Sequence, residues 1–122
     1  MHDSIVIALG GSLLSDEDSD KIESWKINFV NLISSIINLG MNVLIVVGGG
    51  KLARRNISKA KENGVNDEFE LDIIGIEATR ENAKEIINLF SNIQNLNKTV
   101  PKSIEDGSIS FQNYDLTIMG GT

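Results

Sequence analysis

Three short apolar runs, each ending in consecutive glycines, constrain the fold of this 122-residue chain most strongly. The runs are Ser4–Leu9, Val43–Val47 and Leu116–Met119, followed by Gly10 and Gly11, Gly48 to Gly50, and Gly120 and Gly121. Continuous apolar runs of this length are typical of strands buried on both faces of a parallel sheet. Because glycine lacks a Cβ, the backbone at such strand ends can approach an anion closely. We therefore expect three buried strands whose glycine loops lie at the ligand-binding edge of one sheet.

Helical periodicity separates these strands. Apolar residues recur at helical spacing in segments that we predict as helices, namely Lys21–Leu39, Lys51–Asn63 and Leu71–Phe90. Gly40 and Gly64 stand where C-terminal helix caps belong. Within the third segment, Gly75 predicts a close approach to a neighbouring element. Alternating strands and helices indicate an α/β fold with a mostly parallel sheet covered on both faces.

The remaining segments carry weaker signals. Ser15–Asp20 is polar and acidic, and we expect a solvated loop that leads into a helix. Thr99 and Val100 form a weak strand candidate, and Lys102–Asp115 is predicted to be irregular. The last strand runs into Gly120, Gly121 and Thr122, where a crossover helix would be expected to follow. On this pattern residues 1–122 resemble the first part of a larger sheet domain.

Composition excludes several classes of protein. With 41% apolar and 23% charged residues, the chain is typical of one soluble globular domain. No apolar run approaches the roughly 20 residues of a membrane span, and no signal leader is recognisable, so we expect a cytoplasmic protein. The absence of cysteine and the single histidine argue against a zinc or thiolate site, and we predict no protein-bound metal site. A net charge of −6 argues against nucleic-acid binding.

Positive charge is nevertheless concentrated where a helix is predicted to begin. Lys51, Arg54 and Arg55 are spaced to share one face of the first helical turns. A helix N-terminus already carries about half a positive charge, so each cation there costs about 0.3–1 kcal/mol unless an anion offsets it. A bound phosphate would reverse the sign of that effect. The alternative is a solvated basic face, which leaves the adjacent glycines without a reason.

Spacing alone leaves the phosphate ligand open. Gly48 to Ala53 fits the dinucleotide pattern G-x-G-x-x-A, and acidic residues follow about 20 positions later, at Glu68, Glu70 and Asp72. That pattern would follow the second strand and would leave the other glycine loops unused. The P-loop pattern is not met, because Leu52 follows Lys51. Several glycine loops at one crevice favour phosphoryl transfer, in which donor and acceptor phosphates are held in line.

Four segments together resemble the amino-acid-kinase superfamily, and most closely its archaeal-type uridylate kinases. They are IALGGSLL (7–14), VVGGGKLAR (46–54), DIIGIEATRENA (72–83) and IMGGT (118–122). The first is shared across the superfamily, whereas the second and third together are more specific. The resemblance implies a three-layer α/β/α fold. It also implies transfer of the ATP γ-phosphate to UMP with Mg²⁺, by a homo-oligomer that is usually a hexamer built from dimers.

The resemblance also implies roles for individual residues. ATP phosphates are expected at Gly11, Ser12, Gly50 and Arg54, and UMP at Gly49, Asp72, Gly120, Gly121 and Thr122. Many relatives carry a lysine in the first strand where this chain has Ala8, and the archaeal-type uridylate kinases also lack that lysine. Lys51 and Arg54 are therefore the candidate charge stabilisers. Asp72 could instead be an exposed helix-start carboxylate, and Thr79 and Arg80 could be helix surface.

Length limits what the resemblance implies. The family's chain continues for about as long again, so residues 1–122 would form the nucleotide-acceptor lobe without the C-terminal ATP lobe. We therefore expect this chain alone to be inactive or nearly so. The alternatives are another kinase of the superfamily, for acetylglutamate, isopentenyl phosphate or glutamate, and a non-catalytic nucleotide-binding or dimerisation module.

Overall fold

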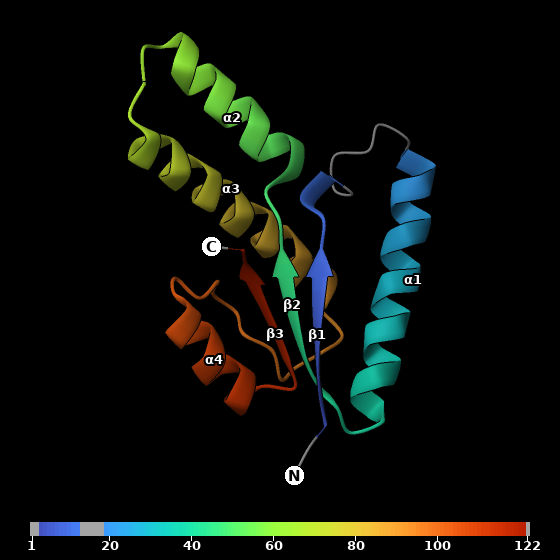
Figure 1. The fold of residues 1–122 in the computed structure, drawn as a ribbon. Helices are drawn as coiled ribbons and strands as arrows, with labels where there is room; N and C mark the ends of the chain where they lie inside the picture. The colour runs from blue at the N-terminus through green and yellow to red at the C-terminus, as the bar shows by residue number, and fades with distance from the viewer. Residues whose placement is uncertain (1–2, 13–18, 122) are drawn as a thin grey trace.

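The computed structural model describes residues 3–12 and 19–121, and predictions for residues 13–18 and for Thr122 lie outside the described residues. The chain forms β1 (Ser4–Leu9), α1 (Ser19–Asn38), β2 (Asn42–Val47), α2 (Gly50–Glu62), α3 (Glu68–Leu89), α4 (Ile104–Asn113) and β3 (Leu116–Gly120) (Figure 1). The three predicted strands and the three predicted helices are confirmed, with ends that differ by a few residues. None of the helices in this described part is long and apolar enough to cross a membrane.

The described strands form one parallel sheet in the order β1-β2-β3. Leu9 lies opposite Val47, and Val47 lies opposite Gly120, so the three strands end at nearly the same level. Two connections are short because glycine ends the preceding helix. Gly40 and Gly64 both have positive φ (91° and 92°), which confirms their predicted role as helix ends. This register brings all three glycine loops to one edge of the sheet.

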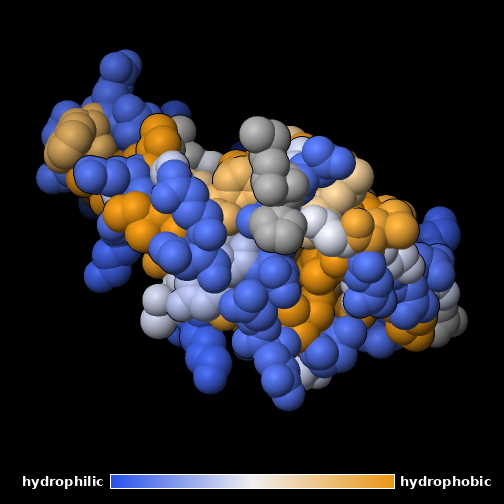
Figure 2. Space-filling view, turned by 90° about the horizontal axis from the view of Figure 1, so that it is seen from below, coloured by the Kyte–Doolittle hydropathy of each residue, from blue (hydrophilic) through white to orange (hydrophobic). Residues whose placement is uncertain are grey.

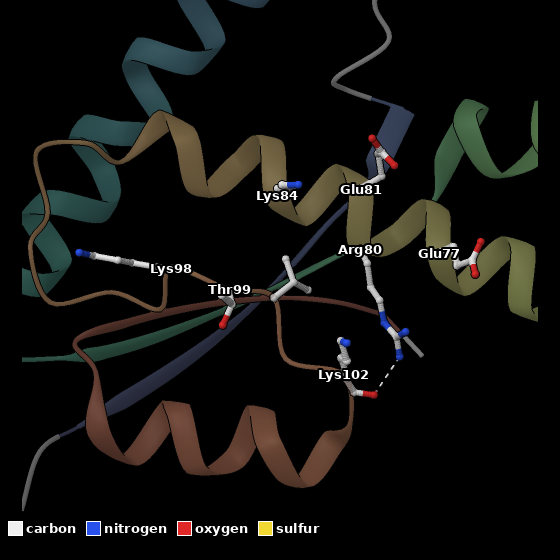
Figure 3. A pocket seen from close by; sticks show the side chains of 8 residues that line it. Glu77, Arg80, Glu81, Lys84, Lys98, Thr99 and Lys102 are labelled. Carbon is white, nitrogen blue, oxygen red and sulfur yellow. Dashed lines mark hydrogen bonds between the residues drawn. The ribbon is translucent and has the colours of Figure 1, made fainter.

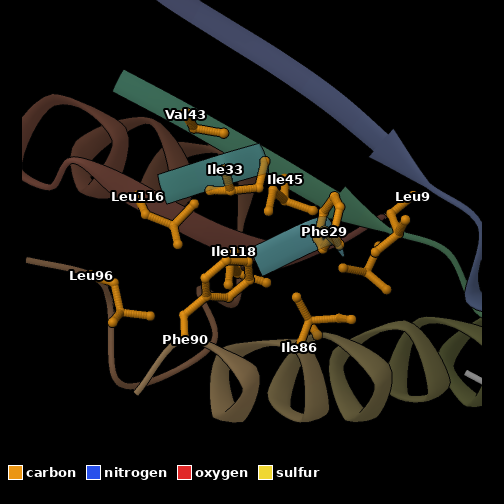
Figure 4. Packing of buried hydrophobic residues seen from close by; sticks show 12 residues of the cluster. Leu9, Phe29, Ile33, Val43, Ile45, Ile86, Phe90, Leu96, Leu116 and Ile118 are labelled. Atoms are coloured by element: carbon orange, nitrogen blue, oxygen red, sulfur yellow. The ribbon is translucent and has the colours of Figure 1, made fainter. Parts of the chain in front are cut away.

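One face of the sheet carries the hydrophobic core, between the strands and helices α1 and α3 (Figure 4). Val43, Ile45 and Val47 alternate along β2, and all three side chains point to this face and are fully buried. The helices contribute Phe29 and Ile33 from α1, and Ala83, Ile86 and Phe90 from α3 and its end. Phe29 stacks on Trp25 and meets Phe90 edge-on, with ring centroids 5.1 and 5.9 Å apart. The helical spacing in the sequence therefore identified the core-facing sides of α1 and α3.

The opposite face of the sheet is covered by α4 only near β3 and β2. A Cβ added to Gly107 of α4 would lie 2.6 Å from Met119 Sδ on β3, which shows how closely the two elements pack. Leu44 and Val46 on β2 are half-buried on this face. On β1, Val6 is 61% exposed. The prediction of a buried first strand is therefore wrong, because β1 is the edge strand of the described sheet and one of its faces is uncovered.

The prediction of an irregular Lys102–Asp115 is also wrong, since α4 occupies most of it. The signal that sequence reasoning missed is the capping pattern S-x-x-D: the Ser103 side chain accepts a hydrogen bond from the Asp106 N–H at 3.0 Å. Gly107 and several small polar residues lower the intrinsic helix propensity. Packing on β3 offsets that loss.

No strand forms at Thr99 and Val100, contrary to prediction. The chain instead contacts the sheet at Leu96, through an isolated bridge to Leu116. Next to it, the Asn97 side chain replaces a strand partner: its Oδ1 accepts from the Ile118 N–H and its Nδ2 donates to the Ile118 carbonyl, both at 2.8 Å. A buried side-chain amide thus closes the outer edge of β3.

Candidate functional site

Backbone hydrogen bonds hold the three glycine loops side by side. The Gly48 N–H donates to the Leu9 carbonyl at 2.9 Å, which ties the loop after β2 to the end of β1. The Gly121 N–H donates to the Val47 carbonyl at 2.9 Å, which ties the loop after β3 to the end of β2. The carboxyl ends of parallel strands are where open α/β sheets bind ligands. The structure therefore brings together the predicted loops at 10–12, 48–50 and 120–121.

The loops lie too close together for any residue other than glycine at Gly11 and Gly50. A Cβ on Gly11 would lie 2.8 Å from the Gly48 carbonyl carbon, and one on Gly50 would lie 2.6 Å from the carbonyl carbon of Gly11. Gly50 also has a φ of 52°, which a side chain would strain. The backbones of the first two loops therefore touch, and α2 starts directly at their junction.

Helix α2 begins without the groups that usually satisfy a helix start. Its N-cap is Gly49, no side chain among the described residues caps it, and its first turn has no acidic residue. In contrast, α3 and α4 are capped by Asp67 and Ser103, and each has two acidic residues in its first turn. Among the described residues, the positive end of the α2 dipole therefore lies at the glycine loops without a side-chain cap or an acidic side chain in its first turn.

The predicted cations lie at this helix start. Lys51, Arg54 and Arg55 are exposed, and none of them forms an ion pair with another described residue. Arg54 Nη2 donates to Ser12 Oγ at 3.3 Å, which connects the first turn of α2 with the loop after β1. Ser12 and Arg54, both predicted to face ATP phosphates, are therefore neighbours. Sequence reasoning brought them together only through the family resemblance.

A hollow of about 350 Å³ opens beside the third glycine loop, between α2, α3 and Gly121. It is lined by Ile57, Leu71, Asp72, Gly75, Ile76, Thr79 and Gly121. Asp72 and Gly121, both predicted to contact UMP, thus border one cavity. The predicted close packing at Gly75 is wrong: a Cβ there would meet only Ile57 Cδ1, at an ordinary 3.6 Å, because the residue faces this hollow.

Two residues of α3 support the loops and were missed or left open by sequence reasoning. Asn82 is 4% exposed, and its Nδ2 donates to the carbonyls of Gly48 and Gly49, both at 3.0 Å. The single hydroxyl proton of Thr79 is shared between the Ile76 carbonyl, 2.6 Å from Oγ1, and the Gly121 carbonyl, 2.9 Å from it, so Thr79 is not merely helix surface. No local pattern in the sequence distinguishes these two side chains from helix surface, because their partners lie in loops far along the chain.

The dinucleotide interpretation fits this arrangement poorly. In that pattern, the acidic residue that follows the glycines binds the ribose and lies about 20 residues on in the next βα unit. Glu68, Glu70 and Asp72 instead lie in the first turns of α3, and no strand intervenes between α2 and α3. The glycine loop after β2 therefore belongs to a different kind of phosphate site.

A separate hollow of about 490 Å³ lies away from the glycine loops, between α3 and residues 98–102 (Figure 3). Its charged lining is mixed, with Glu77 and Glu81 beside Arg80, Lys84, Lys98 and Lys102. Arg80 Nη2 is already bonded to the Lys102 carbonyl at 2.8 Å. Four cations and two carboxylates leave the lining with a formal excess of two positive charges, and Arg80 connects α3 with the loop.

Metal ligands do not gather in the described part of the chain, where no three Asp, Glu, His or Cys side chains could together hold an ion.

The parallel sheet with glycine loops at its carboxyl edge, next to the basic start of α2, defines an α/β fold of the amino-acid-kinase type. Residues 3–108 match the amino acid kinase family, and the chain belongs to it. It is 38% identical over 124 residues to the uridylate kinase of Thermoplasma volcanium and 42% identical over 118 residues to that of Archaeoglobus fulgidus. These alignments cover 100% and 97% of this chain, but 50% and 49% of the relatives.

A solved structure of one of these relatives has a similar fold. The crystal structure of the Archaeoglobus fulgidus uridylate kinase superposes with a TM-score of 0.77 at 40% identity, over 100% of this chain and 51% of that one. The likeness supports the three-layer α/β/α fold predicted from the resemblance. The chain spans about half the length of the curated relatives it matches.

Proposed function

We propose that residues 1–122 form the nucleotide-acceptor lobe of a uridylate kinase, an enzyme that transfers the γ-phosphate of ATP to UMP and so serves pyrimidine nucleotide biosynthesis. The relatives named above are uridylate kinases, and their similarity extends over the whole of this chain. Because the chain spans only half of their length, we expect it to have little or no activity by itself.

The observation that carries the proposal is the uncapped start of α2 at the junction of two glycine loops. A helix start without a side-chain cap, its positive dipole end and nearby cations form a site suited to a phosphate group. We assign Gly11, Ser12, Gly50 and Arg54 to the ATP phosphates. Lys51 is exposed in the same turn, and we assign it with Arg54 to stabilising charge on the transferred group.

The acceptor is assigned to the neighbouring loop and hollow. Gly49, Asp72, Gly120, Gly121 and Thr122 are proposed to contact UMP. The cavity bordered by Asp72 and Gly121 supports this assignment, because it lies next to the proposed ATP loops. Asp72 is exposed, so its carboxylate is free to accept hydrogen bonds from ribose hydroxyls.

Adjacent sites for two phosphates suit an in-line transfer. A UMP phosphate oxygen bonds to the γ-phosphorus while the bond from that phosphorus to the β–γ bridging oxygen breaks, giving UDP and ADP. Negative charge spreads over the transferred group during this step, and fixed N–H groups and cations stabilise it. Mg²⁺ would enter with the nucleotide, and a dimer-based hexamer and a cytoplasmic location are further expectations of the family resemblance.

Calorimetric titration of this chain with UMP, UDP, ATP and acetylglutamate tests the proposal. Binding of UMP without binding of acetylglutamate would support it. Binding of acetylglutamate in place of UMP would assign the chain to another kinase of the family, and further titrations with isopentenyl phosphate and glutamate test the two other acceptors. Silence toward every nucleotide would leave a purely structural module and refute the proposal.

Replacement of Arg54 by alanine tests the phosphate site itself. We expect Arg54→Ala to weaken binding of a phosphate ligand about tenfold, since a charge-assisted hydrogen bond contributes about 1.5–3 kcal/mol before solvent screening. The helix should become no less stable, because the substitution removes an unfavourable cation from its N-terminus. Lys59→Ala, in the last turn of the same helix, is the matched control and should leave binding unchanged. Lower thermal stability of ligand-free Arg54→Ala would contradict the argument.

A further inference from the structure

Gly75 is a glycine in the interior of a long helix, and the conformation of the backbone does not require it. It lies within the 22-residue helix α3, away from both ends. Glycine is, after proline, the least favourable residue in a helix interior. The described glycines with positive φ are Gly40, Gly50 and Gly64, so Gly75 has a backbone conformation that any residue adopts. An alanine at this position would therefore suit the helix better.

The packing of α3 against its neighbours does not require Gly75 either. A Cβ added there would meet only Ile57 Cδ1 of α2, at an ordinary 3.6 Å. At Gly120, in contrast, an added Cβ would lie 2.9 Å from the Arg80 backbone nitrogen, which is too close. A methyl group at Gly75 would gain a contact with Ile57, and burying apolar surface is favourable. The missing side chain at Gly75 therefore has no explanation within the described chain.

The missing side chain opens the hollow of about 350 Å³ that Asp72 and Gly121 border. Asp72, Gly75 and Thr79 are spaced to share one face of α3, and all three line this hollow. Thr79 Oγ1 lies 2.9 Å from the Gly121 carbonyl oxygen, at one end of that face. Asp72 is exposed at the other end. A ligand that reaches from Asp72 to Gly121 therefore passes over Gly75.

The second glycine loop also approaches α3 at this point. A Cβ added to Gly49 would lie 3.6 Å from the Gly75 carbonyl oxygen. Gly49, Gly75 and Gly121 thus bring bare backbone from three elements to one place. Without a Cβ, a ligand can lie directly against the backbone of each.

The opposite end of the strands has a different character. Figure 2 shows the molecule from that end, with hydrophobic surface between hydrophilic residues. The glycines that follow the three strands lie at the carboxyl edge of the sheet instead (Figure 1). Helix α3 runs past this edge, where Asn82 donates to the carbonyls of Gly48 and Gly49. A ligand held by the glycine loops is therefore within reach of α3.

We propose that Gly75 is a specificity-determining residue, against which the ribose 5′-phosphate of the acceptor nucleotide packs directly. This inference rests on the proposed function, which takes UMP as the acceptor, with its ribose at Asp72 and its phosphate at the loop after β3. A side chain at Gly75 would occupy the space of the sugar and exclude it. An acceptor without a sugar ring would need no such opening.

Replacement of Gly75 by alanine tests this inference, because it separates ligand binding from stability. Gly75→Ala should raise the midpoint of thermal unfolding by about 3 °C, since it improves helix propensity. In calorimetric titrations it should weaken UMP binding by about tenfold or more, because the methyl group intrudes on a filled site. Asn88→Ala is the matched control: Asn88 is exposed on the same helix, and alanine raises helix propensity there too. Asn88→Ala should leave UMP binding unchanged.

Nuclear Overhauser contacts between the α-protons of Gly75 and the ribose protons of bound UMP give a second measurement, made on the original chain. We expect such contacts. Their absence, or equal UMP affinity of Gly75→Ala and Asn88→Ala, would overturn the inference and leave the proposed function standing. A lower unfolding midpoint of Gly75→Ala would also overturn it, because packing would then require the glycine. If the original chain does not bind UMP, the proposed function fails and this inference fails with it.

Discussion

Removing the Asn82 amide tests whether one buried side chain positions the phosphate-binding loops. Asn82 donates from α3 to two consecutive carbonyls of the second glycine loop, Gly48 and Gly49. Each hydrogen bond contributes about 1 kcal/mol net, so Asn82→Ala should lower the free energy of unfolding by about 2 kcal/mol. Asn82→Asp keeps the shape but replaces both donors with an acceptor, and it should cost at least as much at neutral pH.

Urea unfolding followed by Trp25 fluorescence measures these losses, because Trp25 stacks on Phe29 at the edge of the core. With an m value of about 1.5 kcal/mol per M, a loss of 2 kcal/mol lowers the midpoint by about 1.3 M. Asn92→Ala is the matched control. The Asn92 amide makes only an exposed hydrogen bond to Ser34, at 3.2 Å, so the change should stay below about 0.5 kcal/mol. If Asn82→Ala and Asn92→Ala have equal midpoints, or Asn82→Asp unfolds like the original chain, the positioning role of Asn82 is refuted.

Two further predictions concern the backbone at Gly50 and the outer edge of β3, which Asn97 closes. Gly50→Ala should lower the unfolding free energy by more than about 1 kcal/mol, because φ is positive and the added Cβ would collide with the loop after β1. Gly10→Ala, which meets nothing within 4 Å, should change it by less than about 0.5 kcal/mol; equal effects in thermal melts would contradict the packing argument. Asn97→Ala should cost about 2 kcal/mol in urea unfolding, since it removes both bonds to Ile118. Asn113→Ala removes one exposed bond and should cost much less, and a comparable loss would show that the edge of β3 needs no closure.

Local patterns in the sequence predicted most of the fold. Apolar runs ending in glycines marked β1, β2 and β3, and helical spacing marked α1, α2 and α3, because each pattern follows from the geometry of a single element. Helix α4 escaped prediction because Gly107 and its polar neighbours weaken its own propensity, and contacts with Met119 compensate. The strand expected at Val100 does not form, for the opposite reason. Local composition suggested that this segment would pair with the sheet, but the Asn97 side chain occupies the edge of β3.

The candidate site, like the fold, could be predicted from the sequence only in part. The glycines and cations of the α2 start could be identified from the sequence, since a positively charged helix start needs an anion for physical reasons that act within one turn. The proximity of Ser12 to Arg54 and of Asp72 to Gly121 required the family resemblance, and no pattern in the chain predicted Asn82 as the residue that holds two carbonyls. Such contacts join residues more than 30 positions apart, so sequence period and local propensity carry no information about them.

The sequence by itself determined which segments become strands and helices, and where backbone and charge are suited to phosphate. Only the tertiary structure decided that β1 is an open edge while β3 is closed, although both runs read as buried strands. Burial of a strand depends on what pairs with its edge and covers its faces, and those neighbours come from elsewhere in the fold. Val6 is apolar in the sequence, but it is exposed because no described element covers its face of β1.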